Sequence, residues 1–288
     1  MARRAPAIER AVAVLNHLAA HPSEQFSLSE LARELDLNKA TAHAMLNALA
    51  EAGYLTRDPR DKSYGLGPGL IAVGTAALES NPAARVAQGP MEKVSRELEL
   101  ECVASAAIGG EIVILESAGV ARPLGISIQP GLRLPLVPPL GSVFVAWAGA
   151  GQIDEWLAAV GPGASGEDLD RYRQALRVVR ERGYSVGLGG DEQQRMIESL
   201  TASDGIHRAP TAPGEEYALV ELADETPHRI NHVGAPVFGP DGRVQIALFL
   251  IGFRGEIPAS EVPAYAERLK QAADEVTASI GGVIPVPG

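Results

Sequence analysis

The feature that most constrains this fold is a pair of short helical segments joined by a three-residue turn, residues 36–38. The stretch LSELARELDLNKATAHAMLNALAEAGYL, residues 28–55, contains both segments. Ser27, with Glu30 three positions later, has the spacing of a capping box, and Asn38 is a favoured cap for the second segment. Two capped helices this close together predict a helix-turn-helix.

The flanking segments extend this pattern to a winged helix-turn-helix. An amphipathic helix is expected over about Ala7–Ala20, because its apolar residues recur at helical spacing. After Gly53, a usual helix stop, the period changes to two, and Tyr54–Arg57 and Ser63–Leu66 flank a polar turn cluster. A linker helix over about Leu70–Leu78 follows the predicted β-hairpin.

The third helix has a bare outward face. At about 100° per residue, one side should face the core and carries Ala42, Met45, Leu46 and Leu49. The opposite side carries Ala40, His43, Ala44 and Asn47. Small side chains let a helix backbone approach base edges in the major groove, and alanine can pack against thymine methyl groups. We interpret this face as a DNA-reading surface in which His43 and Asn47 are the polar readers.

Residues around this face complete the predicted contacts with DNA. In the first turn of the helix, Lys39 and Thr41 suit phosphate groups. The wing carries three basic residues that suit contacts with the neighbouring DNA backbone or minor groove, namely Arg57, Arg60 and Lys62. The alternative is that alanine simply favours helix, and that the bare face meets solvent or another subunit.

The distribution of charge separates two parts of the chain. A formal net charge of −11 argues against nucleic acid as a partner, but residues 1–80 hold 8 Lys/Arg and 9 Asp/Glu, whereas the remainder holds 17 and 27. A near-neutral first part and an acidic second part predict two units with different roles. Cys102 is the only cysteine, so no intrachain disulfide can form. No segment approaches the ~18 apolar residues of a membrane span, and we expect a cytoplasmic protein.

The second part alternates between strand-like and helix-like segments. Helices are expected near residues 91–100, 141–148, 153–160, 168–182 and 261–280, and strands near 102–108, 112–116, 122–128, 184, 217–222, 232–238 and 243–253. This order predicts one α/β domain with a mostly antiparallel sheet. The expected organisation is therefore α+β, with a winged helix-turn-helix and linker helix over residues 1–80 and a second domain over residues 81–288.

The second domain lacks the motifs of common enzymes. Neither a nucleophile elbow nor a phosphate-binding loop of the GKS/T type is present. His228 and His232 have the spacing of a metal pair, but no third ligand is evident. We therefore expect no catalytic residues, no metal and no cofactor, with an enzyme of unknown type as one alternative.

The chain resembles the IclR family of bacterial transcription regulators over nearly its whole length. The likeness is carried by AIERAVAVLNHLA, by the helix-turn-helix stretch, and by YGLGPGLIAVG, PGLRLPL, RERGYSV and GAPVFGPDGRVQIAL. It implies a GAF-like effector-binding second domain and a dimeric or tetrameric regulator of operons, often for the catabolism of small organic acids or aromatic compounds. Ala44 departs from the family, which commonly has Arg there, so operator sequences of relatives do not transfer.

The resemblance also implies where an effector binds: near the helix that follows PGLRLPL, and beside the strands near the end. The candidate residues are Leu140, Gly141, Ser142, Trp147, Glu192, His232, Phe249 and Ile251. Backbone amides around Gly141 and Ser142, at a helix N-terminus, could hold one oxygen. Many relatives have carboxylate-binding serines where this chain has Phe249 and Ile251, which favours a larger, mainly hydrophobic or aromatic effector with one polar end. Alternatively, these side chains fill the space and leave no pocket.

These observations predict a ligand-responsive transcription regulator whose partners are a double-stranded DNA operator, a small-molecule effector and further copies of itself, as a homodimer or homotetramer. No membrane is expected as a partner. The alternative from another class is a ligand sensor that acts through protein partners and uses the winged helix for dimerisation. The segment 193–224 is longer than the family usually has, and we expect a lid or a surface excursion there.

Overall fold

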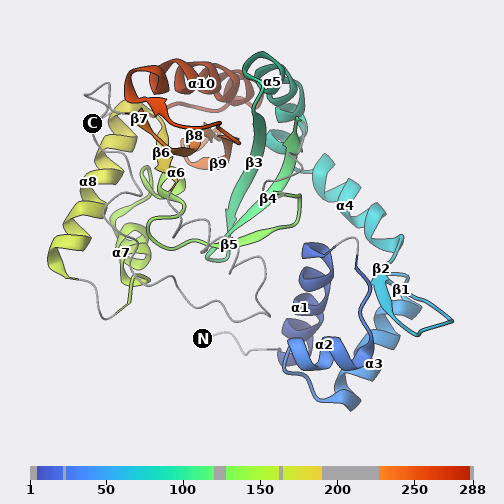
Figure 1. The fold of residues 1–288 in the computed structure, drawn as a ribbon. Coiled ribbons are helices and arrows are strands. Elements are labelled where there is room, and N and C mark those ends of the chain that lie inside the picture. Colours follow the sequence, from blue (N-terminus) through green and yellow to red (C-terminus); the bar gives the residue numbers. More distant parts are fainter. Residues whose placement is uncertain (1–4, 22–23, 120–127, 162–164, 190–226, 286–288) are drawn as a thin grey trace. The chain divides into compact units, whose positions relative to one another are not determined.

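The computed structural model describes residues 5–21, 24–119, 128–161, 165–189 and 227–285 (Figure 1). These residues divide into two compact units, with the division between Asn81 and Pro82. Each unit has its own hydrophobic core.

The first unit is a winged helix-turn-helix followed by a further helix. Its elements are α1 (Pro6–Ala20), α2 (Leu28–Glu34), α3 (Lys39–Glu51), β1 (Leu55–Arg57), β2 (Tyr64–Leu66) and α4 (Gly69–Glu79). The capping box is confirmed: the Ser27 amide donates to a Glu30 carboxylate oxygen at 2.7 Å, and the Glu30 amide donates to the Ser27 hydroxyl at 3.3 Å. The amide of Ala40 donates to the side-chain oxygen of Asn38 at 2.9 Å, which caps α3 as predicted.

The core of this unit explains why α3 presents a fixed face outward. Its fully packed members are Val14, Leu18, Phe26, Leu31, Leu46, Leu55 and Tyr64. The predicted inward face of α3 is confirmed, because Ala42 and Leu46 are buried and Met45 and Leu49 pack against the core. A contact of 2.9 Å between Nε2 of His17 and a carboxylate oxygen of Glu34 further joins α1 to α2. Packing against α1, α2 and the wing therefore fixes which face of α3 points outward.

In contrast, α4 buries none of its residues. Its apolar side chains Ile71, Val73 and Leu78 are 71%, 50% and 42% exposed. A helix this apolar with no buried side lacks a packing partner among the described residues of its own unit.

The second unit is built on a six-stranded antiparallel sheet in the order β5-β4-β3-β9-β8-β6. Its strands are β3 (Glu101–Ile108), β4 (Glu111–Ala118), β5 (Arg133–Pro135), β6 (Ser185–Leu188), β8 (Ile230–Phe238) and β9 (Val244–Ile251). Its helices are α5 (Pro82–Leu98), α6 (Ser142–Val145), α7 (Ala150–Ala158), α8 (Gly166–Arg182) and α10 (Val262–Ser279), with a 3₁₀ turn at Ala259–Glu261. A small separate pair joins β7 (Pro227–His228) to β10 (Ile257–Pro258). The α+β class with a mostly antiparallel sheet is thereby confirmed.

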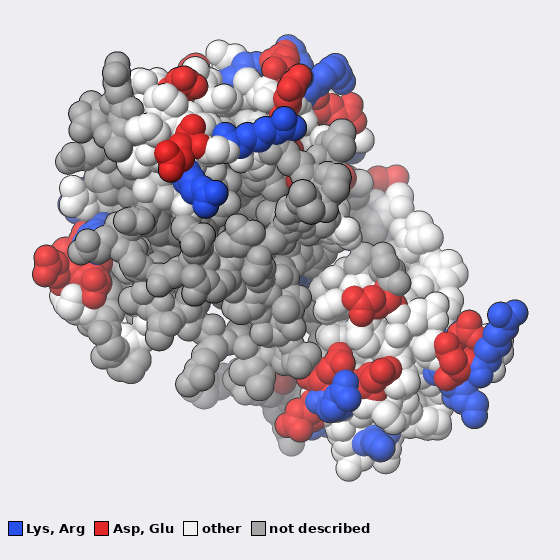
Figure 2. All heavy atoms as spheres, viewed as in Figure 1, with Lys and Arg blue, Asp and Glu red and all other residues white. Residues whose placement is uncertain are grey.

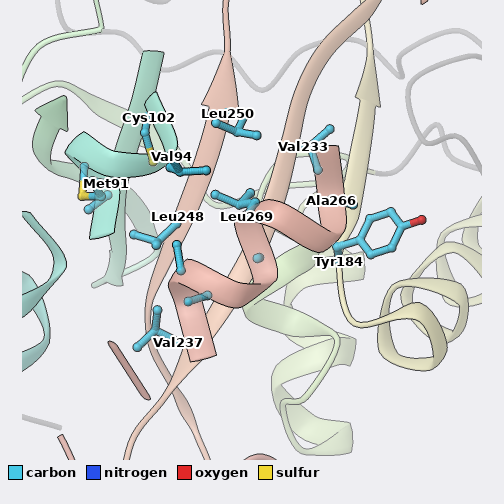
Figure 3. Close-up of a cluster of buried hydrophobic side chains, with 14 of the residues drawn as sticks. Met91, Val94, Cys102, Tyr184, Val233, Val237, Leu248, Leu250, Ala266 and Leu269 are labelled. Carbon is cyan, nitrogen blue, oxygen red and sulfur yellow. The ribbon is translucent and has the colours of Figure 1, made fainter. Parts of the chain in front are cut away.

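Helices α5 and α10 cover one face of this sheet (Figures 1 and 3). Figure 3 shows Leu248 and Leu250 of β9 and Val233 of β8 meeting Leu269 of α10 and Met91 of α5 in the resulting core. Because strand side chains alternate between faces, the intervening residues of β3, β8 and β9 point to the opposite face. We call this opposite side of the sheet the site face; α6 lies against it through β8 and β9.

Some boundaries differ from the sequence expectations. The helix expected near residues 91–100 begins much earlier, at Pro82, because Pro is well tolerated at the start of a helix. It also continues through Pro90. The helix expected over residues 141–148 is a single turn, α6, and β5 was not expected. The strand expected over residues 122–128 lies almost wholly outside the described residues, as do the strand near 217–222 and the long segment 193–224.

Candidate functional site

The candidate DNA-reading surface predicted from the sequence corresponds to the outward face of α3. Ala40, His43 and Ala44 are exposed and Asn47 is half-buried, so their predicted position opposite the core is as expected. The side-chain amide nitrogen of Asn47 lies 3.4 Å from Nδ1 of His43, one helical turn earlier. This nitrogen can donate to an unprotonated ring nitrogen, which leaves the Asn47 oxygen facing outward as an acceptor. The two polar readers therefore form one unit on an otherwise small-residue face.

The ends of the surface carry the candidate phosphate contacts. Lys39 is exposed in the first turn of α3, and Thr41 beside it is half-buried. In the wing, Arg57, Arg60 and Lys62 are all exposed. Figure 2 shows that basic side chains gather at the tip of the β1–β2 hairpin together with acidic ones.

The acidic residues of the wing shape the hairpin. The amide of Arg60 donates to Asp58 at 2.7 Å, and the amide of Ser63 donates to Asp61 at 2.9 Å. The hydroxyl and amide of Ser63 lower the pKa of Asp61, so this carboxylate stays ionised while it holds the turn. Side-chain caps of this kind fix the backbone from which the basic residues project.

The effector candidates meet on the site face. Phe249 and Ile251 of β9 and His232 of β8 lie there, and His232 is the register partner of Ile251. The rings of His232 and Phe249 meet edge to face at 5.4 Å between centroids. Leu140 belongs to the same apolar cluster as Phe249. Sequence positions more than 100 residues apart are therefore brought into one layer.

Two phenylalanines that the sequence analysis missed complete this layer. Phe144 of α6 lies 6.4 Å from Phe249 between ring centroids, and Trp147 lies 5.3 Å from Phe238 of β8. We call the rings of Phe144, Trp147, His232, Phe238 and Phe249 the aromatic layer. The alternation of β8 could have pointed to Phe238, since it shares the parity of His232. Nothing local distinguishes Phe144 from an ordinary core residue.

His232 is a neutral member of the aromatic layer. Desolvation lowers its pKa from 6.5 to about 4, so the imidazole carries no charge near pH 7. Its ring lies over Gly187 of β6, where any Cβ would overlap the imidazole. Phe249 lies over Gly234 in the same way. These glycines leave the room in which both rings rest on the sheet.

The oxygen-binding helix N-terminus expected near Gly141 and Ser142 is only weakly developed. Because α6 has four residues, it supplies little of the dipole that makes a longer helix bind anions. Gly141 has φ +80°, and its neighbour Leu140 accepts a hydrogen bond from the indole nitrogen of Trp156 at 2.9 Å. This segment is thus anchored by packing. Glu192 lies outside the described residues.

Three observations on the described part of the chain concern metal binding, thiol chemistry and membrane spans. Among the residues described, no three His, Cys, Asp or Glu side chains are placed to hold a metal ion. Burial raises the pKa of the Cys102 thiol to about 12, so it stays protonated at neutral pH. None of the described helices is long and apolar enough to cross a membrane.

Comparison with known proteins identifies the chain. Residues 7–59 match the IclR helix-turn-helix domain. The transcriptional regulator KipR of Bacillus subtilis is 23% identical over 95% of this chain and 96% of its own length. A crystal structure of an IclR-type transcriptional regulator from Alicyclobacillus acidocaldarius covers 97% of this chain and 100% of its own, with a TM-score of 0.70 and 24% identity. This chain belongs to the IclR family of transcription regulators.

As an IclR-family regulator, the chain has DNA as a partner. One further structure bears on the second unit of this IclR regulator. It is an IclR homologue from Microbacterium hydrocarbonoxydans complexed with 4-hydroxybenzoate, with a TM-score of 0.62 and 20% identity over 95% of this chain and 98% of that one. The shared fold is what this likeness establishes.

Proposed function

We propose that this IclR-family regulator binds operator DNA as a homo-oligomer and responds to a mainly apolar, aromatic small molecule. The observation that carries the proposal is the outward face of α3, which over its first two and a half turns carries only alanine besides the paired His43 and Asn47, with Glu51 following in the last turn. A surface of this shape can enter the major groove and place one amide against an adenine edge.

The alternative interpretation of this face, a packing surface against a protein, fits less well. Packing surfaces bury large apolar side chains, whereas the DNA-reading surface offers mainly alanine methyls and polar groups, with no large apolar side chain among them. The exposed basic residues of the wing and Lys39 lie at its margins, where phosphate contacts would fix the register of the helix on DNA.

Self-association is supported by α4. This helix buries none of its residues and exposes Ile71, Val73 and Leu78. It therefore presents an apolar surface whose exposure to water is unfavourable. A second copy of the chain would offer the same surface, which suits a two-fold interface. Pairing is also what a single winged helix needs, because two half-sites supply the affinity and specificity that one lacks.

The aromatic layer supports the proposed class of effector. Its rings would bury a flat apolar ligand, and each buried CH₂ would contribute about 0.8 kcal/mol. The homologue that was crystallised with 4-hydroxybenzoate makes an aromatic ligand a reasonable expectation for this chain. Effector binding would act as a population shift that favours one arrangement of the paired DNA-binding units over another.

Fluorescence anisotropy at two salt concentrations, with DNA from the region upstream of the gene that encodes this chain, tests the proposal. We expect selective, salt-sensitive binding that His43→Ala and Asn47→Ala each weaken at least several-fold. Gln88→Ala, a polar-to-alanine change on the exposed side of α5, is the matched control and should leave binding unchanged. Binding that is equal on scrambled DNA and indifferent to both variants would favour a sensor that acts through protein partners.

The oligomer is tested separately by sedimentation velocity. Ile71→Glu together with Val73→Glu should lower the sedimentation coefficient and weaken DNA binding, because charge disrupts an apolar interface. An unchanged coefficient would remove α4 from the proposed interface.

A further inference from the structure

Ser105 of β3 is a buried hydroxyl whose hydrogen-bonding capacity is unmet. Its side chain is fully buried, and among the residues that the structure describes its Oγ has no hydrogen-bond partner. Buried hydroxyls are nearly always paired, because leaving one without a partner forfeits its hydration. A group of this kind calls for a partner beyond the described residues of the chain, and a bound ligand can be that partner.

Ser105 differs from the other buried serines and threonines of the described residues; the one further buried hydroxyl without a partner among them is that of Tyr64, in the core of the first unit. Four further Ser or Thr side chains are buried, and each has a partner: Ser63 donates to Asp61, Ser95 to the carbonyl of Leu100, Ser185 to the carbonyl of Gly234, and Thr277 accepts from the amide of Phe238. Ser185 is the closest match, since it also lies on the site face. Two serines on one face of one sheet therefore differ in whether the fold satisfies them.

The register of the sheet places Ser105 beneath α6. Cys102, Ala104 and Ala106 of β3 point into the core under α5 and α10, so Ser105 points to the site face. It is the register partner of Ala247 on β9, whose side chain packs in one cluster with Val143 and Phe144. The Cβ atoms of such a pair lie about 5 Å apart.

The hydroxyl thus lies beside the aromatic layer. Phe249 follows Ala247 by two residues on the same strand and the same face, a separation of about 7 Å along the strand. Phe144 belongs to the same cluster as both, with its ring centroid 6.4 Å from that of Phe249. A flat ligand that displaced Phe144 from Phe249 would have one end at Ser105 and its body between rings.

The electrostatics of this layer select the polar end of such a ligand. Among the described residues of β3, β8 and β9 that point to the site face, none is Lys or Arg. His232 is neutral at pH 7, and Glu101, the register partner of Ile251, adds an acidic group on the same face. A buried carboxylate would find no counter-charge among these residues, and an anion would be repelled. A neutral hydroxyl meets neither penalty.

We infer that Ser105 hydrogen-bonds the polar end of the effector, and that this end is a neutral hydroxyl on an aromatic ring rather than a carboxylate. The inference rests on the proposed function and deepens it, because it names the residue and the ligand chemistry. It also explains why the fold keeps an unpaired hydroxyl: the ligand is its partner. Binding would shift α6, since Phe144 must move to admit the ring.

Three ring compounds that differ only in their polar end provide the test on the full-length protein. They are 4-methylphenol, which is neutral with a hydroxyl, toluene, which lacks a polar end, and 4-methylbenzoate, which is anionic. We expect 4-methylphenol to bind most tightly in titrations followed by tryptophan fluorescence or calorimetry. Ser105→Ala should weaken 4-methylphenol by about tenfold, the equivalent of one hydrogen bond, and leave toluene unchanged.

The matched control is Ser185→Ala, the same substitution on the same face at a hydroxyl that already donates to Gly234. It should leave the preference for 4-methylphenol over toluene intact. Thermal unfolding without ligand separates a structural role: Ser105→Ala should not lower the midpoint, because the hydroxyl it removes has no partner. A lower midpoint, or equal weakening of 4-methylphenol and toluene, would overturn the inference.

The remaining outcomes also decide the question. Tighter binding of 4-methylbenzoate, or no saturable binding of any of the three rings, would overturn the neutral-hydroxyl inference. Operator binding by the same preparations distinguishes the two proposals. If operator binding is intact, only the inference fails; if it is absent as well, the proposed function fails.

Discussion

The neutral state of His232 predicts a specific loss of stability in mild acid. Desolvation lowers its pKa from 6.5 to about 4 in the folded protein. The unfolded chain therefore binds the proton more readily than the folded one, and acidification favours unfolding. The stabilising effect of His232 is fully present above pH 6.5 and is lost as the pH falls towards 4.

The size of the effect follows from this displacement of the pKa. At about 1.4 kcal/mol per pKa unit, the complete loss below pH 4 is about 3 kcal/mol. Between pH 7.5 and pH 5.5 the same linkage gives a loss of about 1.3 kcal/mol in the free energy of unfolding. The smaller interval is the better test, because it avoids general acid unfolding.

Urea unfolding of wild type and His232→Gln at these two pH values measures the effect. Both tryptophans of the chain, Trp147 and Trp156, lie in the second unit, so their fluorescence reports on the domain that contains His232. The variant should lose about 1.3 kcal/mol less than wild type between pH 7.5 and pH 5.5. His43→Gln, at an exposed histidine of the other unit, controls for the loss of a histidine as such. Equal losses in wild type and His232→Gln would refute the argument.

Three further predictions concern local features. Gly187→Ala should lower the free energy of unfolding by about 1–3 kcal/mol, because its Cβ would displace the ring of His232. The control Gly151→Ala, at an open helical position, should not destabilise the protein. Equal losses of the two variants in chemical denaturation would contradict the packing argument. Asn38→Ala removes the cap of α3 and should cost about 1 kcal/mol, seen as a lower thermal midpoint of the first unit by circular dichroism, with an unchanged midpoint speaking against the cap. Ala44→Arg adds a cation to the exposed face of α3, so it should tighten DNA binding and steepen its salt dependence by about one phosphate contact. An unchanged slope of the logarithm of the binding constant against the logarithm of the salt concentration would place this position away from DNA.

Much of the first unit could be predicted because its signals are local. The Ser27–Glu30 capping box and the Asn38 cap join groups within three residues of each other, and the structure has both hydrogen-bonded as expected. Gly53 has φ +75° after the last turn of α3, a conformation that glycine adopts at little cost. Interactions of this range depend little on the rest of the fold, so spacing alone predicts them.

The errors fall where tertiary packing overrides local signals. Pro90 argues against a continuous α5, yet the helix runs through it with Ala87, Met91 and Val94 buried against the sheet. Burial of that face outweighs the hydrogen bond that a proline removes. The apolar run after Gly141 predicts a two-turn helix, but α6 ends at Val145. Within its single turn, Val143 and Phe144 pack in one hydrophobic cluster and Val145 packs in another.

The sequence by itself determined the DNA-binding half of this regulator, its alternating second domain and the types of residue available for an effector. Only the tertiary structure decided which of them meet. Ser105 has the local appearance of any strand serine, and both its register partner Ala247 and the Phe144 that packs in one cluster with Ala247 are distant in the chain. Whether a strand side chain points to the core under α5 and α10 or to the site face depends on the strand register, and a shift of one residue would exchange the two faces. That register is fixed by the pairing of β3 with β9, which no short stretch of sequence contains.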